Sequence, residues 1–486
     1  MPDIDLNFSG LYQANAHLFI RNMFGKEHAF RAGTIATVAE KTAYGYVNDF
    51  IANVYATQKI PYAQKRWWAV NCMNVKRTTG QHPGGIVIVP QEKTVFDFTP
   101  YNFPADDDTS DWYTTHFDFE NIHDNLLKFD ILGHDDPTVL KYLKDITHVD
   151  PRTIPTNDEK VISLFTSLKA LNLDTKTVVY KEKNAALGLP EFGTRFVREM
   201  LNEAQPENFS DLIRISGLSH GTNVWTNNQQ ILIKEGKKLN ELITCRDDIM
   251  TFLSSLKIEP KTAFKIMEDI RKGKGLKPEY EKLLIEHKVP QWYLNACKKI
   301  VYLFPKAHAT AYVLSAWRIA WFKVYYPLAY YATYFSVRCE VFDIKCMKEG
   351  AIAIFHRLND IKQRLDHKET MNSVSKKEQD LYVVLEVALE MCLRGYKFSN
   401  IDLKKSDATL FQINEETKTI IPPFIVLDGL GKNVADSIIQ ARNEHEFMSI
   451  KDFKDRTKTN KTLVDKLIEL NVFNDLNEDD QLTFKF

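Results

Sequence analysis

The sequence predicts an α+β protein in which helices predominate. Three short segments have the character of β-strands, and the chain beyond Asp136 reads mostly as helix. Residues 2–8 alternate polar and apolar side chains, which is typical of a strand with one buried face. Residues 86–89 and 126–132 are apolar runs of strand length. Residues 31–75 repeat apolar positions at three- and four-residue steps, so we expect helix there.

The composition is that of a folded chain with several cores. Of 486 residues, 44% are hydrophobic, and the length suggests about three domains. The net charge of −1 excludes a general attraction to polyanions, so any contact with nucleic acid must come from local basic stripes. The cysteines never stand in C-x-x-C spacing, which disfavours a zinc or redox site and indicates a reducing, cytoplasmic location. No signal peptide is expected, and no membrane span, because the apolar stretch 324–337 is shorter than the ~20 residues required.

Two aspartates near the start of the chain predict a metal site. Asp3 and Asp5 stand two apart on the expected strand, so both side chains leave one face and their repulsion favours a cation between them. Carboxylate oxygens suit Mg²⁺, and two such ions about 3.5–4 Å apart serve phosphoryl transfer. Asp130, a lone acid in the run 126–132, is the candidate third ligand. The alternative is that Asp3 and Asp5 are solvated surface acids and that Asp130 caps a turn before Gly133.

Residues 76–85 combine cations, hydroxyls and three glycines. Glycines let a phosphate approach backbone amides, while Lys76 and Arg77 supply charge and His82 follows close behind. The segment lacks the G-K-[ST] ending of a Walker loop. An ordinary basic turn leading into the strand at Ile86 explains the pattern about as well.

Residues 304–312 begin a long helix at Pro305, and their side chains suit a nucleotide. Lys306 near the helix start could meet a triphosphate, and Tyr312, four residues after His308, could stack on a base. An amphipathic core helix is the competing interpretation. Arg195 and Arg198 share a helical face and could meet phosphates, although a solvated charge pair would look the same.

Residues 427–435 fit the G-h-G-x-x-x-A pattern of a helix–hairpin–helix turn. Gly429 and Gly431 permit a tight hairpin, and the next helix presents free amides with Lys432 and Asn433 to a DNA phosphate. A second, weaker helical pair is expected over residues 461–473. The terminal peptide could seat apolar side chains in a groove of a partner protein, or be an inert end; its candidate residues are Gln481, Leu482, Phe484 and Phe486.

Taken in order, these segments resemble the PolC-type DNA polymerase III alpha subunit, a bacterial replicative polymerase. The resemblance runs nearly end to end and rests on several long motifs, which lie at residues 2–10, 77–90, 129–137, 193–198, 216–225 and 304–312. It implies a palm related to the polymerase beta nucleotidyltransferases, in which Asp3, Asp5 and Asp130 match the catalytic carboxylates and hold two Mg²⁺ ions. The implied reaction is template-directed addition of deoxynucleoside triphosphates to a primer 3′ end.

The resemblance also implies a division into domains. Residues 1–30 and 76–140 would form the palm, 31–75 a helical thumb, 141–340 the fingers, 341–475 the duplex-binding helix–hairpin–helix region, and 476–486 a peptide for the sliding clamp. The clamp peptide departs from the usual family form at Phe484 and Phe486.

Full-length members carry several domains and the first part of the palm before the point where this chain begins. We therefore expect the isolated chain to bind primed DNA weakly and to polymerise little, unless a separate N-terminal segment completes it. A rival interpretation is a non-catalytic fragment that binds DNA and the clamp. A third is a metal-dependent phosphohydrolase that uses His116, Asp118, His123 and Asp124.

Overall fold

The computed structural model describes residues 4–103, 107–367 and 369–479. The chain divides into two compact units, Met1–Thr138 and Val139–Phe486. Each unit is described by itself below. The expected α+β class with a helical majority is confirmed.

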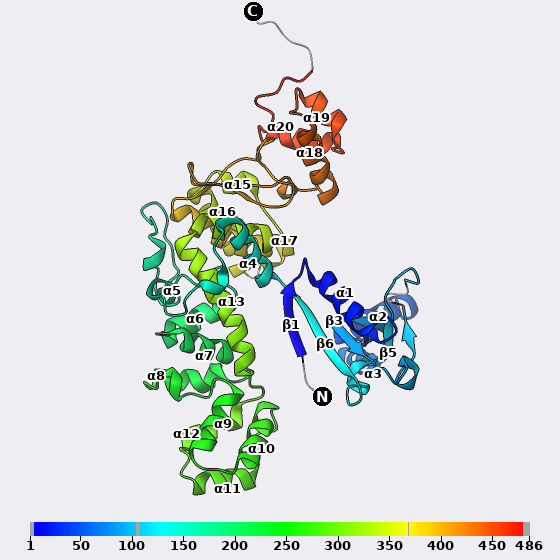
Figure 1. Ribbon diagram of the computed structural model, residues 1–486, viewed down its shortest axis with the longest axis vertical. Helices are drawn as coiled ribbons and strands as arrows, with labels where there is room; N and C mark the ends of the chain where they lie inside the picture. Colours follow the sequence, from blue (N-terminus) through cyan, green and yellow to red (C-terminus); the bar gives the residue numbers. More distant parts are fainter. Residues whose placement is uncertain (1–3, 104–106, 368, 480–486) are drawn as a thin grey trace, which may run out of the picture. The chain divides into compact units, whose positions relative to one another are not determined.

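A six-stranded mixed sheet forms the first unit, in the spatial order β1-β6-β3-β2-β5-β4 (Figure 1). The pairs β1–β6 and β2–β5 are parallel, and the other pairs are antiparallel. The strands are β1 Ile4–Ser9, β2 Ala29–Thr37, β3 Lys76–Ile88, β4 Tyr101–Asn102, β5 Thr114–Asp118 and β6 Leu127–His134.

Side chains of β3 enter two different cores because alternate residues of a strand point to opposite faces. Ile86 and Ile88 pack with Ala16 and Ile20 of α1 (Gln13–Phe24) on one face. Val87 and Val89 pack with other residues, among them Phe30 and Leu126, in a separate cluster. Burial on both faces explains why residues 86–89 form an unbroken apolar run.

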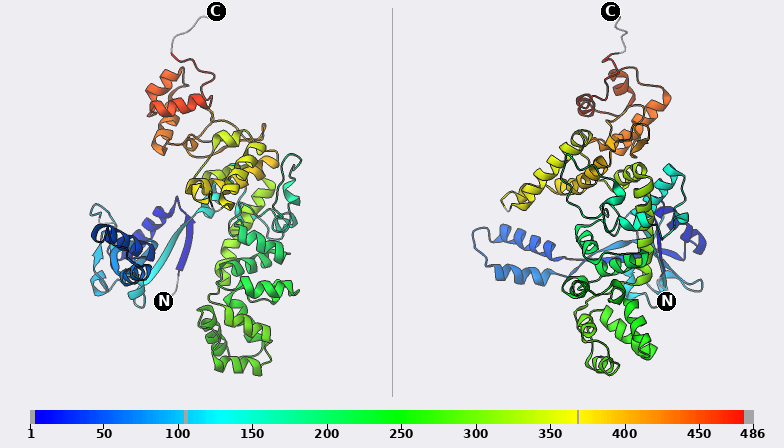
Figure 2. Two further views of the ribbon diagram at one scale, coloured as in Figure 1. Left: turned by 180° about the vertical axis from the view of Figure 1, so that it is seen from behind. Right: turned by 90° about the vertical axis from the view of Figure 1, so that its left-hand side faces the viewer.

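Two helices, α2 (Glu40–Val54) and α3 (Tyr62–Cys72), form an antiparallel pair that extends away from the sheet (Figure 2). They pack through a small cluster that includes Val47 and Ala69. The prediction of helix from residue 31 is wrong for its first part, because β2 continues to Thr37. Pairing with β3 along one edge and β5 along the other holds this segment extended, and tertiary pairing overrides its helical spacing.

Residues 76–85 lie within β3, so the alternative interpretation, an ordinary basic turn leading into a strand at Ile86, is wrong. Their backbone pairs with β2, from Lys76 opposite Thr37 to Gln81 opposite Gly33. The expected strand over 126–132 is confirmed in β6, and residues 4–8 of the first expected strand are confirmed in β1.

The second unit is built from helices around one large core. Pro305 precedes α13 and Pro327 opens α14, as proline at a helix start favours. Among the described residues, no helix is long and apolar enough to cross a membrane. The helices down to the end of this core are α4 Asp135–Thr147, α5 Glu159–Ser163, α6 Arg195–Ala204, α7 Phe209–His220, α8 Gln230–Lys234, α9 Arg246–Ser255, α10 Pro260–Arg271, α11 Pro278–Glu286, α12 Gln291–Lys299, α13 Lys306–Tyr325, α14 Pro327–Val337, α15 Ile344–Lys348, α16 Ala351–Asp366 and α17 Lys376–Leu393.

The large core continues past residue 340, where a domain boundary is predicted, because α16 and α17 contribute to it. A small sheet in the order β7-β9-β8 follows α17. A second core then joins α18, α19 and α20. These elements are β7 Lys397–Phe398, β8 Gln412–Asn414, β9 Thr419–Ile421, α18 Lys432–Glu444, α19 Ile450–Arg456 and α20 Lys461–Glu469.

Candidate active site

Two of the three predicted carboxylates stand side by side on neighbouring strands. β1 and β6 run parallel, and in their register Asp5 is the partner of Asp130. Residues opposite each other on adjacent strands project from the same face of a sheet. The fold therefore brings together two acids that are far apart in the sequence. Asp3 lies outside the described residues.

A bulge in β3 forms the other border of Asp130. Arg31 of β2 pairs with Ile86 and Gly33 pairs with Gln81, so residues 82–85 stand opposite Ala32 alone. Gly85 is the partner of Asp130 on this side. A Cβ on Gly85 would lie 2.9 Å from His82 Nδ1 and 2.9 Å from Ala32 Cβ, so only glycine fits.

Side chains of α1 and β2 fix the bulge by its carbonyl oxygens. Arg31 Nη2 donates to the oxygens of His82 at 3.0 Å and Pro83 at 2.9 Å. Gln13 Nε2 donates to Ile131 O at 2.7 Å and to Pro83 O at 3.2 Å. The bonds to His82 and Pro83 use backbone acceptors that the bulge removes from the ladder. The bond to Ile131 connects α1 to β6.

His82 is held as a neutral neighbour of Asp130. Its Nδ1 accepts hydrogen bonds from the amides of Gly84 at 3.2 Å and Gly85 at 2.7 Å, so this nitrogen carries no proton. Burial, which outweighs the attraction of Asp130, lowers the pKa of His82 below its ordinary value. His82 Nδ1 lies 3.6 Å from Asp130 Oδ1, and in this state it cannot donate to that oxygen.

Asp130 consequently has one satisfied and one unsatisfied carboxylate oxygen. Its Oδ2 lies 3.0 Å from Lys128 Nζ. Its Oδ1 is buried and has no hydrogen-bond partner among the described residues. A buried anionic oxygen without a donor is costly. This donor set fits a hard divalent cation. The described residues, which do not include Asp3, contain no cluster of three metal-ligating side chains.

Lys76 and Arg77 lie at the other end of β3 from this site. Lys76 stands opposite Thr37, which lies five residues along β2 from Ala32 at the bulge. At about 3.3 Å per residue, this separation is roughly 17 Å. Both are exposed, and the Arg77 guanidinium lies 6.0 Å from the ring centre of Tyr46 on α2. Of the basic residues predicted in this segment, the structure brings only His82 to Asp130.

The start of α13 carries a row of rings in contact, of which one pair is stacked. The ring centres of His308 lie 5.1 Å from Phe304 and 4.7 Å from Tyr312, and His220 of α7 stacks on Phe304 at 4.9 Å. The backbone amide of Lys306 donates to Asp247 Oδ2 at 2.8 Å. A carboxylate therefore already occupies the helix N-terminus where a triphosphate was expected.

Arg195 and Arg198, both on α6, have different surroundings. The Arg195 side chain is 84% exposed and pairs with Glu199. Arg198 is buried: its Nε lies 3.0 Å from Glu182, its Nη1 donates to Gly193 O at 2.6 Å, and Glu386 lies 4.0 Å from Nη2. This geometry gives Arg198 a structural partner, so it does not present a free guanidinium to a phosphate.

The hairpin around Gly429 has the backbone that the motif requires. Gly429 has φ +89°, a conformation that favours glycine, and Gly431 precedes the first turn of α18. Leu430 and Ala435 are buried, whereas Lys432 and Asn433 are exposed. The expected helical pair within 461–473 is instead one helix, α20, which follows α19. Lys466 of α20 donates to Asp428 O at 2.6 Å and braces the hairpin.

The residues of the phosphohydrolase alternative do not converge among the residues described. His116 Nδ1 lies 2.9 Å from Asn102, and Asp118 caps a 3₁₀ turn. His123 pairs with Asp124 on the surface, with side chains 57% and 86% exposed. The four clamp-peptide residues, Gln481, Leu482, Phe484 and Phe486, lie outside the described residues.

Three residues that contact the bulge or Asp130 were not among those predicted from the sequence. Gln13, Arg31 and Lys128 all contact the bulge or Asp130. A signal was present for two of them. Arg31 interrupts an apolar strand, and Lys128 stands two residues before Asp130, on the same face of β6.

The sequence of this chain is similar to parts of known proteins. A portion of PolC-type DNA polymerase III from Ureaplasma parvum is 52% identical over 99% of this chain, and those from Mycoplasmopsis pulmonis and Bacillus subtilis are each 50% identical over 99%. The chain belongs to the PolC-type DNA polymerase III family. It spans only 33–34% of the length of these relatives, so it corresponds to a portion of a PolC-type protein.

Three sequence families divide the PolC-type portion. The bacterial DNA polymerase III alpha NTPase domain matches residues 1–67 and 52–133, which include Asp5 and Asp130. The bacterial DNA polymerase III alpha subunit finger domain matches residues 136–289. A helix-hairpin-helix motif matches residues 395–482, which include the hairpin at Gly429.

Proposed function

We propose that this chain is the part of a replicative DNA polymerase that supplies catalytic carboxylates, nucleotide contacts and duplex contacts. The reaction is template-directed addition of a deoxynucleotide to a primer 3′ end, inside the bacterial cytoplasm. The single observation that carries the proposal is the register that places Asp5 opposite Asp130, with Gly85 as the partner of Asp130 on its other side.

The carboxylates suit a magnesium-dependent reaction. Asp3, Asp5 and Asp130 would hold two Mg²⁺ ions, which would supply charge neutralisation at the attacking primer oxygen and the leaving pyrophosphate. The unsatisfied Oδ1 of Asp130 supports this assignment. Neutral His82 leaves the negative charge of the site for the cations. Lys128 pairs with the remaining oxygen of Asp130 and keeps the carboxylate in one orientation.

Nucleotide and DNA contacts are assigned to basic and aromatic groups that are exposed or half-buried. Arg195, Lys306, His308 and Tyr312 would meet the incoming nucleotide, with Arg198 fixing α6 from within. Lys76 and Arg77 would meet the DNA backbone near the α2–α3 pair. Lys432 and Asn433 at the hairpin of Gly429 and Gly431 would hold a duplex phosphate without reading bases. The terminal residues Gln481, Leu482, Phe484 and Phe486 would bind the sliding clamp.

The proposal includes a partner segment for β1. In the described sheet β1 pairs with β6 alone, and Leu6 is 38% exposed. Relatives about three times as long provide sequence that could add a strand at this edge. A strand held from one side only positions its carboxylates poorly, so the chain alone should polymerise little.

Primer extension with Mg²⁺ and all four nucleotides tests the proposal. The chain is assayed alone and after joining to the sequence that precedes this portion in a PolC-type relative. We expect robust extension only after joining. In the joined protein, Asp130→Asn should abolish incorporation and spare binding of primed DNA, while the exposed Asp124→Asn serves as the matched control. Incorporation that survives Asp130→Asn removes this residue from the mechanism, and robust extension by the chain alone removes the need for a partner.

A non-catalytic DNA- and clamp-binding role is the second candidate. The observation that favours it is that the hairpin region has its own hydrophobic core. Salt-dependent duplex binding without any metal requirement, together with failure of the joined protein to extend a primer, would select this role.

A further inference from the structure

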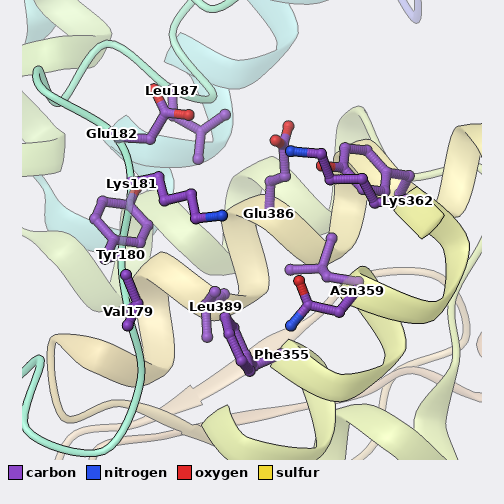
Figure 3. A pocket seen from close by; sticks show the side chains of 12 residues that line it. Val179, Tyr180, Lys181, Glu182, Leu187, Phe355, Asn359, Lys362, Glu386 and Leu389 are labelled. Atoms are coloured by element: carbon purple, nitrogen blue, oxygen red, sulfur yellow. The ribbon is translucent and has the colours of Figure 1, made fainter. Parts of the chain in front are cut away.

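A small cavity in the second unit is lined by residues that no motif predicted. It lies between the segment 179–187 and the helices α16 and α17 (Figure 3). Its volume is about 90 Å³. An apolar cavity of roughly 150 Å³ admits benzene, so this smaller one takes the edge of a single ring, with the rest of the ligand outside.

The walls of the cavity are fixed by buried contacts. The hydroxyl of Tyr180 donates to Glu390 Oε2 at 3.2 Å, which holds one side. Arg198 joins Glu182 on that side to Glu386 of α17 on the other. A cavity with walls held in this way exists before any ligand arrives, so binding requires little ordering.

Two lysines add positive charge at the mouth. Lys181 and Lys362 extend over the cavity from opposite walls (Figure 3). Glu182 and Glu386 line the same cavity, and the buried Arg198 lies 3.0 Å from the first and 4.0 Å from the second. Lys362 also interacts electrostatically with Glu386. The lining itself carries two lysines and two glutamates. The buried Arg198 beside the glutamates adds one further positive charge, and this excess favours an anion.

The floor of the cavity suits a planar ring. Leu187, Phe355, Leu358 and Leu389 supply apolar surface. The half-buried Asn359 also lines the cavity, and its side-chain amide is drawn in Figure 3. An amide offers both a donor and an acceptor to the edge of a base. Apolar walls, one amide and two lysines together match a base and its phosphate.

We propose that this cavity binds a nucleoside monophosphate unit with a single-ring base, the ring against Phe355 and the phosphate on Lys181 and Lys362. The unit is either a free nucleotide or an unpaired nucleotide of a single strand. The site is separate from Asp130 and does not depend on the proposed polymerase activity.

Isothermal titration of the full chain in EDTA, with thymidine 5′-monophosphate as the probe, tests the site. We expect saturable binding that Lys181→Gln with Lys362→Gln weakens at least tenfold. Lys183→Gln, an exposed neighbour that does not line the cavity, is the matched control and should bind normally. Asp130→Asn should also bind normally, which separates this test from that of the polymerase proposal.

Further probes identify the ligand. Asn359→Ala should remove the preference for thymidine monophosphate over inorganic phosphate. A short oligothymidylate that binds through the same two lysines shows that the source is a strand, and binding of the mononucleotide alone shows that it is free nucleotide. The proposal is overturned by absence of saturable binding, by binding that the double variant leaves unchanged, or by equal binding of inorganic phosphate.

Discussion

Asp5 and Asp130 are register partners in adjacent parallel strands, and Gly85 is the partner of Asp130 on its other side. The acid is thus bordered by a second acid on one side and by a residue without a side chain on the other. Since each neighbour is set by strand register, a shift of one residue would turn the carboxylates to opposite faces.

Gly85→Ala should disrupt the site, because the added Cβ would come within 2.9 Å of both the His82 ring and the Ala32 side chain. We expect a loss of stability of about 1–3 kcal/mol in urea unfolding and a larger loss of primer extension in the joined protein. Gly45→Ala on α2, where a Cβ meets nothing within 4 Å, is the matched control and should cost nothing. Normal extension by Gly85→Ala would show that the bulge does not position Asp130.

Acid should destabilise the first unit through His17. Burial, with a smaller contribution from Arg31, lowers the pKa of His17 from 6.5 to about 4. Between these values the unfolded chain binds a proton that the folded chain does not, so stability falls as the pH drops from 6.5 toward 4. The full effect is on the order of 3 kcal/mol.

Urea unfolding at several pH values, followed by fluorescence, measures this effect, because Trp112 contacts His17. The His17→Gln variant should show a shallower pH dependence than the parent chain. His123→Gln, whose imidazole is 57% exposed, should keep the parent slope. An unchanged slope in His17→Gln would contradict the assignment.

Lys323→Met should strongly destabilise the second unit. Lys323 Nζ lies 2.7 Å from Glu390 Oε1 and donates to the backbone oxygens of Ala185 and Leu187, and both charged side chains are fully buried. Removing one partner of such a pair leaves a buried charge and costs about 3–5 kcal/mol.

The comparison for this variant is Lys345→Gln, which breaks the ion pair with Glu469, where the two side chains are 62% and 61% exposed. It should cost less than about 1 kcal/mol in the same denaturation experiment. Equal effects of the two substitutions would mean that Lys323 is not held as a charged partner of Glu390.

Lys432→Gln should weaken duplex binding by the same factor for every sequence, since the hairpin meets phosphates only. The slope of log affinity against log salt should become shallower by about one. Lys418→Gln, in the turn between β8 and β9, is the control. A sequence-dependent loss would indicate that Lys432 contacts a base.

Local pattern sufficed for several parts of this molecule. Alternation identified the strand that carries Asp5, the apolar run 126–132 identified the strand that carries Asp130, and Pro305 marked the start of α13. The glycines around Leu430 identified the hairpin, and the family follows from motif order. Each of these signals depends on a few neighbouring residues, so the sequence alone contains it.

Only the tertiary structure decided which residues meet. Residues 31–37 have a helical spacing but are strand, because β3 and β5 provide hydrogen-bond partners on both sides. Arg198 has the pattern of a phosphate ligand, yet Glu182 neutralises it in the interior. The bulge at 82–85 and the cavity beside Lys181 arise from contacts between distant segments. Such contacts depend on long-range packing and register, which no local window of the sequence contains.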